Sequence, residues 1–271
     1  MSAADTSTTA PALRADVPTP TGSRPTSLAT LSAVELRKAV DTRAGRWLLI
    51  VVGILALGGT AIGLFAVGPA QRTYETFLRL NLNLTGFILP VVGILLVTGE
   101  WSQRSALTTF ALVPRRSRVL AAKLVAALAI AVVGWAVAFG LACLGTALAS
   151  RPAGFPADQV WALSGGQVGE SLLWVVLSMG LGVALGLAFL NSAAAIVLTF
   201  VLPLAWTILA SLVTALHEHV QSWLDPGVSW NHLLSNDLSG RHWAEIATTT
   251  VVWVLLPGAI GAYRMLTREV S

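Results

Sequence analysis

The chain has 271 residues, of which 55% are hydrophobic and 11% charged, and its mean hydropathy is +0.75. A soluble domain carries about 25% charged residues, so this composition excludes an ordinary soluble enzyme and indicates a protein embedded in lipid. The net charge of +4 does not indicate nucleic acid, because the cations cluster at the ends of apolar runs, as membrane orientation requires. A single cysteine, Cys143, excludes an intrachain disulfide.

Residues 1–31 are rich in Ala, Ser, Thr and Pro and contain no apolar core, so we expect a disordered cytoplasmic tail. Without an apolar run they do not have the pattern of a secretory signal. Residues 32–271 are expected to form one membrane domain. Ser32 and Glu35 have the spacing of a capping box, which predicts that a helix begins near Ser32.

This first predicted helix is amphipathic and leads into the first apolar run. Its apolar residues recur at helical spacing at Ala33, Leu36, Val40, Ala44 and Trp47. Its charged residues include Glu35, Arg37, Lys38, Asp41, Arg43 and Arg46. We expect the helix to lie in the inner interface of the membrane, with its charged face in water.

Six runs are long enough to cross a hydrocarbon core, which requires about 20 helical residues. They cover residues 47–67, 80–99, 124–148, two halves of 171–216, and 246–263. The stretch 171–216 contains no charged residue and is too long for one span, so Asn191 and Ser192 are predicted to form a turn between a fourth and a fifth span. The expected fold is all-α, with six transmembrane helices.

Lysine and arginine are distributed unequally between the two sides of this arrangement. With the N-terminus inside, 13 of the 17 cations fall on the cytoplasmic side and 4 outside. The positive-inside rule therefore places both termini in the cytoplasm, with the protein in the cytoplasmic (inner) membrane.

The cytoplasmic loop between the second and third spans has a specific order of residues. An acid ends one span, a short mixed helix over 102–113 follows, and then come a proline, a basic turn and a lysine that opens the next span. Pro114 ends the predicted helix, because it has no amide to donate. We expect Glu100, at the wet membrane edge, to pair with Arg104 one turn later. The candidate residues are Glu100, Trp101, Arg104, Leu107, Thr108, Phe110, Pro114, Arg115, Arg116, Arg118 and Lys123.

This loop resembles the coupling loop of type-2 ABC exporter permeases, through Glu100, Trp101, Thr108, Leu112, Pro114, Arg116 or Arg118, and Lys123. The basic helix before the first span and the C-terminal span followed by Arg264 and Arg268 are also similar to that family. The resemblance implies that the loop docks on a separate ABC ATPase, present in two copies, which would hold ATP and Mg. It also implies a second permease subunit, identical or related, and alternating access. No cofactor is expected on this chain.

Two absences in the sequence support a permease that lacks its own energy source. No Asp, Glu, Lys, Arg or His lies deep within a predicted span, although ion-driven transporters need such groups. The chain also lacks the GxxxxGK[ST] phosphate loop, so it is not expected to be an enzyme by itself. A charge-free interior suggests a hydrophobic or amphipathic cargo, such as a drug, a lipid-linked molecule or a peptide antibiotic.

The predicted outer segment between the last two spans contains four histidines. His217 and His219 lie on different faces of a helix, and the zincin spacing H-E-x-x-H is absent, so no metal site is predicted. We expect an interfacial or re-entrant cap there, with Leu216, Val220, Trp223 and Leu224 in the outer leaflet. Two alternatives stay open: a membrane enzyme with a site in this His/Asp-rich segment, and a non-transporting anchor or assembly protein.

Overall fold

The computed structural model describes residues 27–102, 115–149, 160–162, 164–235 and 238–267. The long helices are α1 (Leu28–Asp41), α2 (Arg43–Phe65), α3 (Tyr74–Ser102), α5 (Arg116–Leu148), α7 (Gly165–Phe189), α8 (Ser192–Leu212), α12 (Gly240–Thr250) and α13 (Leu256–Thr267). Shorter elements are η1 (Pro69–Gln71), α9 (Thr214–His219), α10 (Gln221–Leu224), α11 (Pro226–Ser229), η2 (Trp230–Leu234) and η3 (Val251–Leu255). Within these described ranges no residue lies in a strand.

Six helical segments are long and apolar enough to cross a membrane, as the sequence predicted. They are α2, α3, α5, α7, α8 and the continuous run from α12 through η3 to α13. The predicted turn between the fourth and fifth spans is confirmed. Leu190 ends α7 in the left-handed region with a φ of 51°, and the Asn191 side chain accepts a hydrogen bond from the amide of Ala194 to begin α8.

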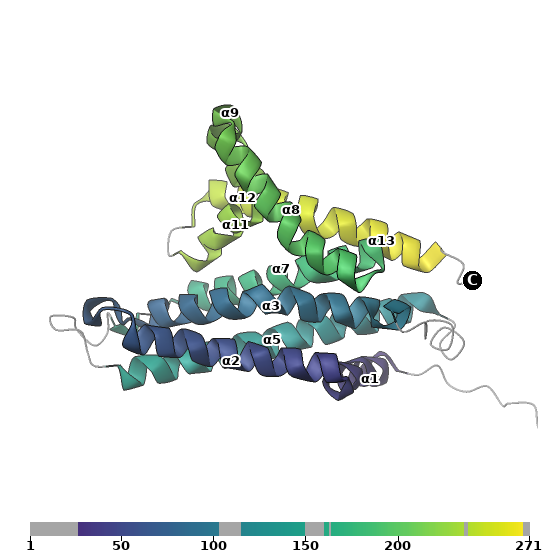
Figure 1. Ribbon diagram of the computed structural model, residues 1–271, viewed down its shortest axis with the longest axis horizontal. Helices are drawn as coiled ribbons and strands as arrows, with labels where there is room; N and C mark the ends of the chain where they lie inside the picture. Colours follow the sequence, from purple (N-terminus) through teal and green to yellow (C-terminus); the bar gives the residue numbers. More distant parts are fainter. Residues whose placement is uncertain (1–26, 103–114, 150–159, 163, 236–237, 268–271) are drawn as a thin grey trace, which may run out of the picture.

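Helix α3 lies at the centre of the molecule and packs against α2, α5 and α7. These four helices run side by side along the long axis in Figure 1. Helix α7 also contacts α8 and α13, which form a second layer on one side of the four-helix layer. The most buried spans are therefore α3 and α7, whereas α8 and α12–α13 leave most of their apolar surface exposed.

Glycines allow the central helices to approach each other closely. A Cβ on Gly182 of α7 would lie 2.0 Å from the backbone oxygen of Pro90 in α3, and one on Gly186 would lie 2.5 Å from Val97. On the other side of α3, Gly59 of α2 packs against Asn81. Gly59 and Gly63 of α2, like Gly182 and Gly186 of α7, form a GxxxG pair, and both pairs serve contacts inside the chain.

The segment between α8 and α12 is a series of short helices, α9 to η2, which we call the cap, and its placement in the outer leaflet stays a prediction. The last span then accommodates Pro257 through one π-helical turn. The amide of Leu256 donates to the oxygen of Val251, five residues earlier, directly before the proline ring that would clash with a regular α-helical turn.

The prediction for the first helix was wrong in two respects. The N-cap of α1 is Ser27, whose side chain accepts from Thr30, while the Ser32 hydroxyl donates to the oxygen of Leu28 inside the helix. The predicted water-facing residue Glu35 is buried, with 5% exposure. Glu35 and Lys38 turn inward because they find partners on α3 and α5, whereas Arg37 and Asp41 stay exposed.

A sharp corner separates α1 from α2, where the sequence predicted one continuous amphipathic stripe. Thr42 is extended, ends α1 and caps α2 by accepting from the amide of Gly45. Gly45 packs so tightly into this corner that a Cβ would lie 1.9 Å from the oxygen of Ala39. The corner turns Glu35 of α1 toward α5, against which α1 packs.

Candidate functional site: a buried ring of charges beside the predicted coupling loop

Four charged side chains from three helices close into a ring, which we call the charge ring: Glu35 and Lys38 of α1, Glu100 of α3, and Lys123 of α5. Glu35 accepts from Lys38 at 2.7 Å through Oε1 and from Lys123 at 2.8 Å through Oε2. Glu100 faces Lys38 at 2.9 Å through Oε1 and Lys123 at 3.4 Å through Oε2. Each carboxylate thus bridges both ammonium groups, and the ring has no net charge.

Lys123 is the most deeply buried member of the charge ring, at 1% exposure. It lies about 10 Å, or two turns, beyond Arg116 where α5 begins, so it is well inside the helix rather than at its first residue. Its three N–H donors point to Glu35, Glu100 and the backbone oxygen of Leu96 at 3.0 Å. A buried ammonium is tolerated only with such complete pairing.

The sequence placed Glu100 at a wet boundary, and this expectation was wrong. Glu100 is 8% exposed and contacts Lys38 and Lys123. Its predicted partner Arg104 lies outside the described residues. The burial follows from the arrival of α1, whose lysine and glutamate cover the end of α3.

Lys38 is the member of the ring that reaches water, with 44% of its side chain exposed. Burial lowers the pKa of Lys38, but hydrogen bonds and charge attraction from Glu35 and Glu100 outweigh this effect and leave the pKa raised above 10.5. Lys38 is therefore positively charged at neutral pH and compensates the second carboxylate of the ring.

A cavity of about 480 Å³ adjoins the charge ring. All four ring members line it, together with apolar residues that include Leu48, Val92 and Leu96. Its volume falls in the range of about 300–1,000 Å³ that is typical of small-molecule sites. Ser192 at the start of α8 also lines the cavity, and its hydroxyl lies 2.7 Å from both Thr98 and Ser102 of α3.

The other predicted coupling residues are only partly described. Trp101 is half-buried against the core, Arg115 is exposed, Arg118 is half-buried, and the guanidinium of Arg116 donates to the oxygen of Met265 at 3.4 Å. The contact with Met265 joins the start of α5 to the end of α13. The following predicted residues lie outside the described ranges: Arg104, Leu107, Thr108, Phe110 and Pro114.

The remaining connecting-helix residues do not join the charge ring. Arg37 pairs with Asp41 at 3.3 Å on the exposed side of α1. Arg43 is exposed at the start of α2, and Arg46 donates to the backbone oxygen of Asp41 at 3.5 Å. Of the predicted connecting-helix set, the structure therefore brings only Glu35 and Lys38 to the site.

A second polar cluster lies in the cap. His232 of η2 stacks on His242 of α12, with ring centroids 3.9 Å apart and planes at 6°. The buried Glu245 lies one turn along α12 from His242, and its Oε2 is 3.9 Å from Nε2 of His232. The sequence suggested no pairing of these histidines, because residue spacing did not reveal that η2 folds back onto α12.

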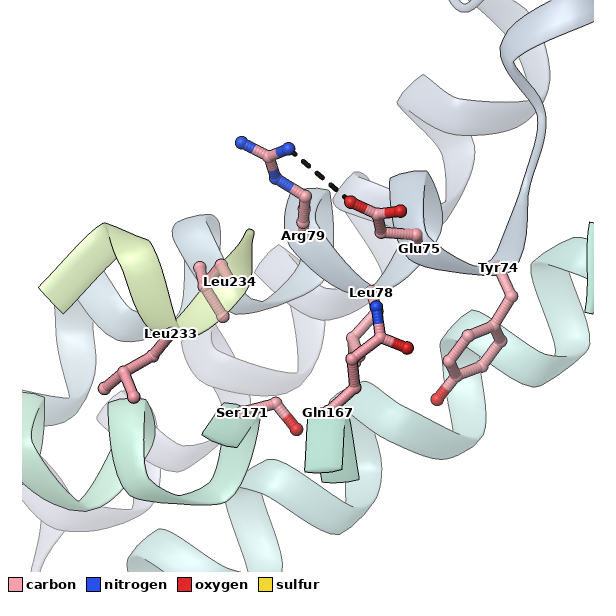
Figure 2. A pocket seen from close by; sticks show the side chains of 8 residues that line it. All are labelled: Tyr74, Glu75, Leu78, Arg79, Gln167, Ser171, Leu233 and Leu234. Carbon is pink, nitrogen blue, oxygen red and sulfur yellow. Dashed lines mark ion pairs between the residues drawn. The ribbon is translucent and has the colours of Figure 1, made fainter. Parts of the chain in front are cut away.

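A smaller cavity lies between α3, α7 and η2, and Figure 2 shows the side chains that line it. Gln167 and Ser171 of α7 contribute polar atoms, while Leu233 and Leu234 of η2 form an apolar wall. Glu75 and Arg79, 3.8 Å apart, form an ion pair beside it. Its volume of about 20 Å³ accommodates one water molecule and excludes any larger ligand.

Comparisons with known proteins do not place the chain in a family. A scan against protein-family models gave no match, and a search of curated proteins gave none either.

Proposed function

We propose that this chain is the membrane-spanning permease subunit of an ATP-driven exporter and works with a separate ATPase. The observation that carries the proposal is the charge ring, because it ties together the two helices that flank residues 103–114, α3 and α5, and joins both to α1. A loop that receives force from a partner needs such a firm attachment at both ends. The resemblance of the loop to that of type-2 ABC exporter permeases supplies the identity of the partner.

The rest of the proposal follows the same resemblance. Two permease chains and two ATPase chains would form the working unit in the cytoplasmic membrane, with ATP and Mg on the ATPase. The cavity beside the charge ring supports a hydrophobic or amphipathic cargo, because most of the surface that lines it is apolar. The absence of a phosphate loop from the sequence agrees with an ATPase on another chain.

Reversal of the basic turn tests the docking part of the proposal. The double variant Arg115→Glu and Arg116→Glu should reduce co-purification of the ATPase and abolish ATP-driven transport, because it reverses the charge that the loop presents. A matched control is Arg43→Glu with Arg46→Glu at the start of α2. It reverses the same number of charges on the same predicted side of the membrane. Unchanged ATPase association in the loop variant would refute the proposal.

Glu100→Gln tests the transmission part. The amide keeps the size of the side chain but removes one charge from the ring, so we expect transport to fall more than protein abundance. ATPase co-purification should persist, because the docking residues are unchanged. Full transport by this variant would show that the charge ring is not needed for coupling.

A further inference from the structure

We propose that His232, His242 and Glu245 form a binding site for one divalent transition-metal ion of the zinc class, in the cap between the last two spans. One ligand atom from each residue can be chosen so that all three atoms lie within 4.8 Å of one another. Zinc bonds to nitrogen and carboxylate oxygen are about 2.0–2.2 Å long, so tetrahedral ligands stand about 3.4 Å apart. The two rings are stacked face to face, and an imidazole binds metal in its own plane, so the ring of His242 has to rotate out of the stack to bring the three atoms to that distance.

The carboxylate of Glu245 is already oriented for such a role. It is 2% exposed, and its Oε1 accepts hydrogen bonds from Ser222 and Arg241, each at 2.9 Å. The other oxygen, Oε2, faces Nε2 of His232. Outer hydrogen bonds of this kind fix the orientation of metal ligands and raise the affinity of a site.

The two imidazoles favour a transition metal over magnesium or calcium. Imidazole nitrogen suits zinc and related ions, whereas magnesium and calcium prefer oxygen ligands.

Metal binding would displace a long hydrogen bond at His242. Its Nδ1 accepts a long bond of 3.3 Å from the amide of Ser239 at the start of α12. The ring can release this bond when it turns toward the ion, because the Ser239 hydroxyl still caps the helix by accepting from the amide of His242. His232 is 28% exposed, which gives an ion access to the site. The bound ion would join η2 to α12 and leave a coordination position for water.

The test uses the full chain, purified with a histidine-free tag and titrated with Zn²⁺, with Mg²⁺ as the negative control. We expect one zinc per chain and a raised melting temperature. The zinc affinity should fall at least 10-fold in each of the three ligand variants, His232→Asn, His242→Gln and Glu245→Gln. It should fall about 10-fold in Ser222→Ala, which removes a hydrogen bond to Glu245. Glutamine at 242 preserves the capping box, and glutamine at 245 still accepts from Ser222 and Arg241. His219→Asn, an exposed histidine outside the cluster, is the matched control and should bind like wild type.

Co²⁺ provides a second measurement on the wild-type protein that does not depend on how the variants fold. A tetrahedral site should give visible absorption bands that zinc then abolishes. Absence of these bands, absence of stoichiometric zinc, or equal zinc affinity in wild type and the three ligand variants would each overturn the inference. Because these readouts involve neither transport nor an ATPase, failure here leaves the proposed function unaffected, and the reverse also holds.

Discussion

At the residue scale, Lys123 is the member of the charge ring whose removal has the clearest consequence. Lys123→Met leaves two buried carboxylates with only Lys38, so we expect a loss of about 3–5 kcal/mol in the free energy of unfolding. Arg37→Met is the matched control, because its exposed pair with Asp41 contributes no more than about 1 kcal/mol. Denaturant titration of the purified protein in detergent measures both.

A double-mutant cycle separates charge balance from packing at the same position. Glu35→Gln alone leaves an excess of positive charge, whereas combined with Lys123→Met it leaves the neutral pair of Lys38 and Glu100. The double variant should therefore lose less stability than the sum of the two single variants, by about 0.5–3 kcal/mol. Simple additivity would show that the four charges do not act together.

Alkaline pH should weaken the ring through Lys38. Because its pKa is raised in the folded protein, the stabilisation that it gives is complete below its unfolded pKa, near 10.5, and is lost as pH rises through the higher folded value. The charged groups that face Lys38 are Glu35 and Glu100. Lys123 lies on the far side of these two carboxylates and contacts both. Above about pH 10.5, melting temperatures should fall less in Lys38→Gln than in wild type. Parallel curves would contradict this assignment.

At the scale of the elements, the crossing of α3 and α7 depends on Gly182. Gly182→Ala places a Cβ against the backbone of Pro90, which cannot move as a flexible side chain would. We expect a loss of about 1–3 kcal/mol from this overpacking. Gly140→Ala in α5, where nothing lies within 4 Å of the new atom, should be neutral or stabilising by up to about 1 kcal/mol. Thermal unfolding of the two variants compares them directly.

Hydrophobic runs were sufficient to predict the six membrane-length helices and the turn near Asn191, because apolar length is a property of the chain alone. The inward turn of α1 was not predictable in the same way. Its charged face looked like a water-facing one, since a sequence does not show that Lys123 and Glu100 will meet Glu35 from helices far along the chain. The opposite charges of Glu100 and Lys123, at the ends of neighbouring spans, were the available signal. The prediction followed the helical periodicity of the apolar residues instead.

The stack of His232 on His242 was missed for a related reason. The two rings belong to different elements, and only the folding of η2 against α12 brings them together. The i, i+3 relation of His242 and Glu245 was visible in the sequence, but two ligands on one helical turn are too common to predict a site.

At the scale of the whole molecule, the two polar clusters lie at opposite ends of the bundle. Figure 1 places α1 and the C-terminus toward one end, with α9, α11 and α12 toward the other. The 13-to-4 distribution of lysine and arginine predicts that the end with α1 faces the cytoplasm.

Thiol labelling tests this orientation. In a Cys143→Ser background, a cysteine at the exposed position His219 should react with an impermeant reagent in intact cells. A cysteine at Thr267, near the end of α13, should react only after the membrane is opened. The opposite pattern would invert the topology and remove the coupling loop from the cytoplasm.

The charge ring also connects membrane insertion with the order of synthesis. A ribosome makes Glu35 and Glu100 before Lys123, so both carboxylates exist when the third span reaches the membrane. An unpaired lysine at the centre of a span opposes insertion by about 2.5–3.5 kcal/mol. Lys123 lies nearer the start of α5, where the cost is smaller, and these earlier acids can relieve it. The first helix thus supplies one of the two insertion partners of Lys123, which follows Glu35 by 88 residues, and a chain that lacked this helix would leave Lys123 with Glu100 alone.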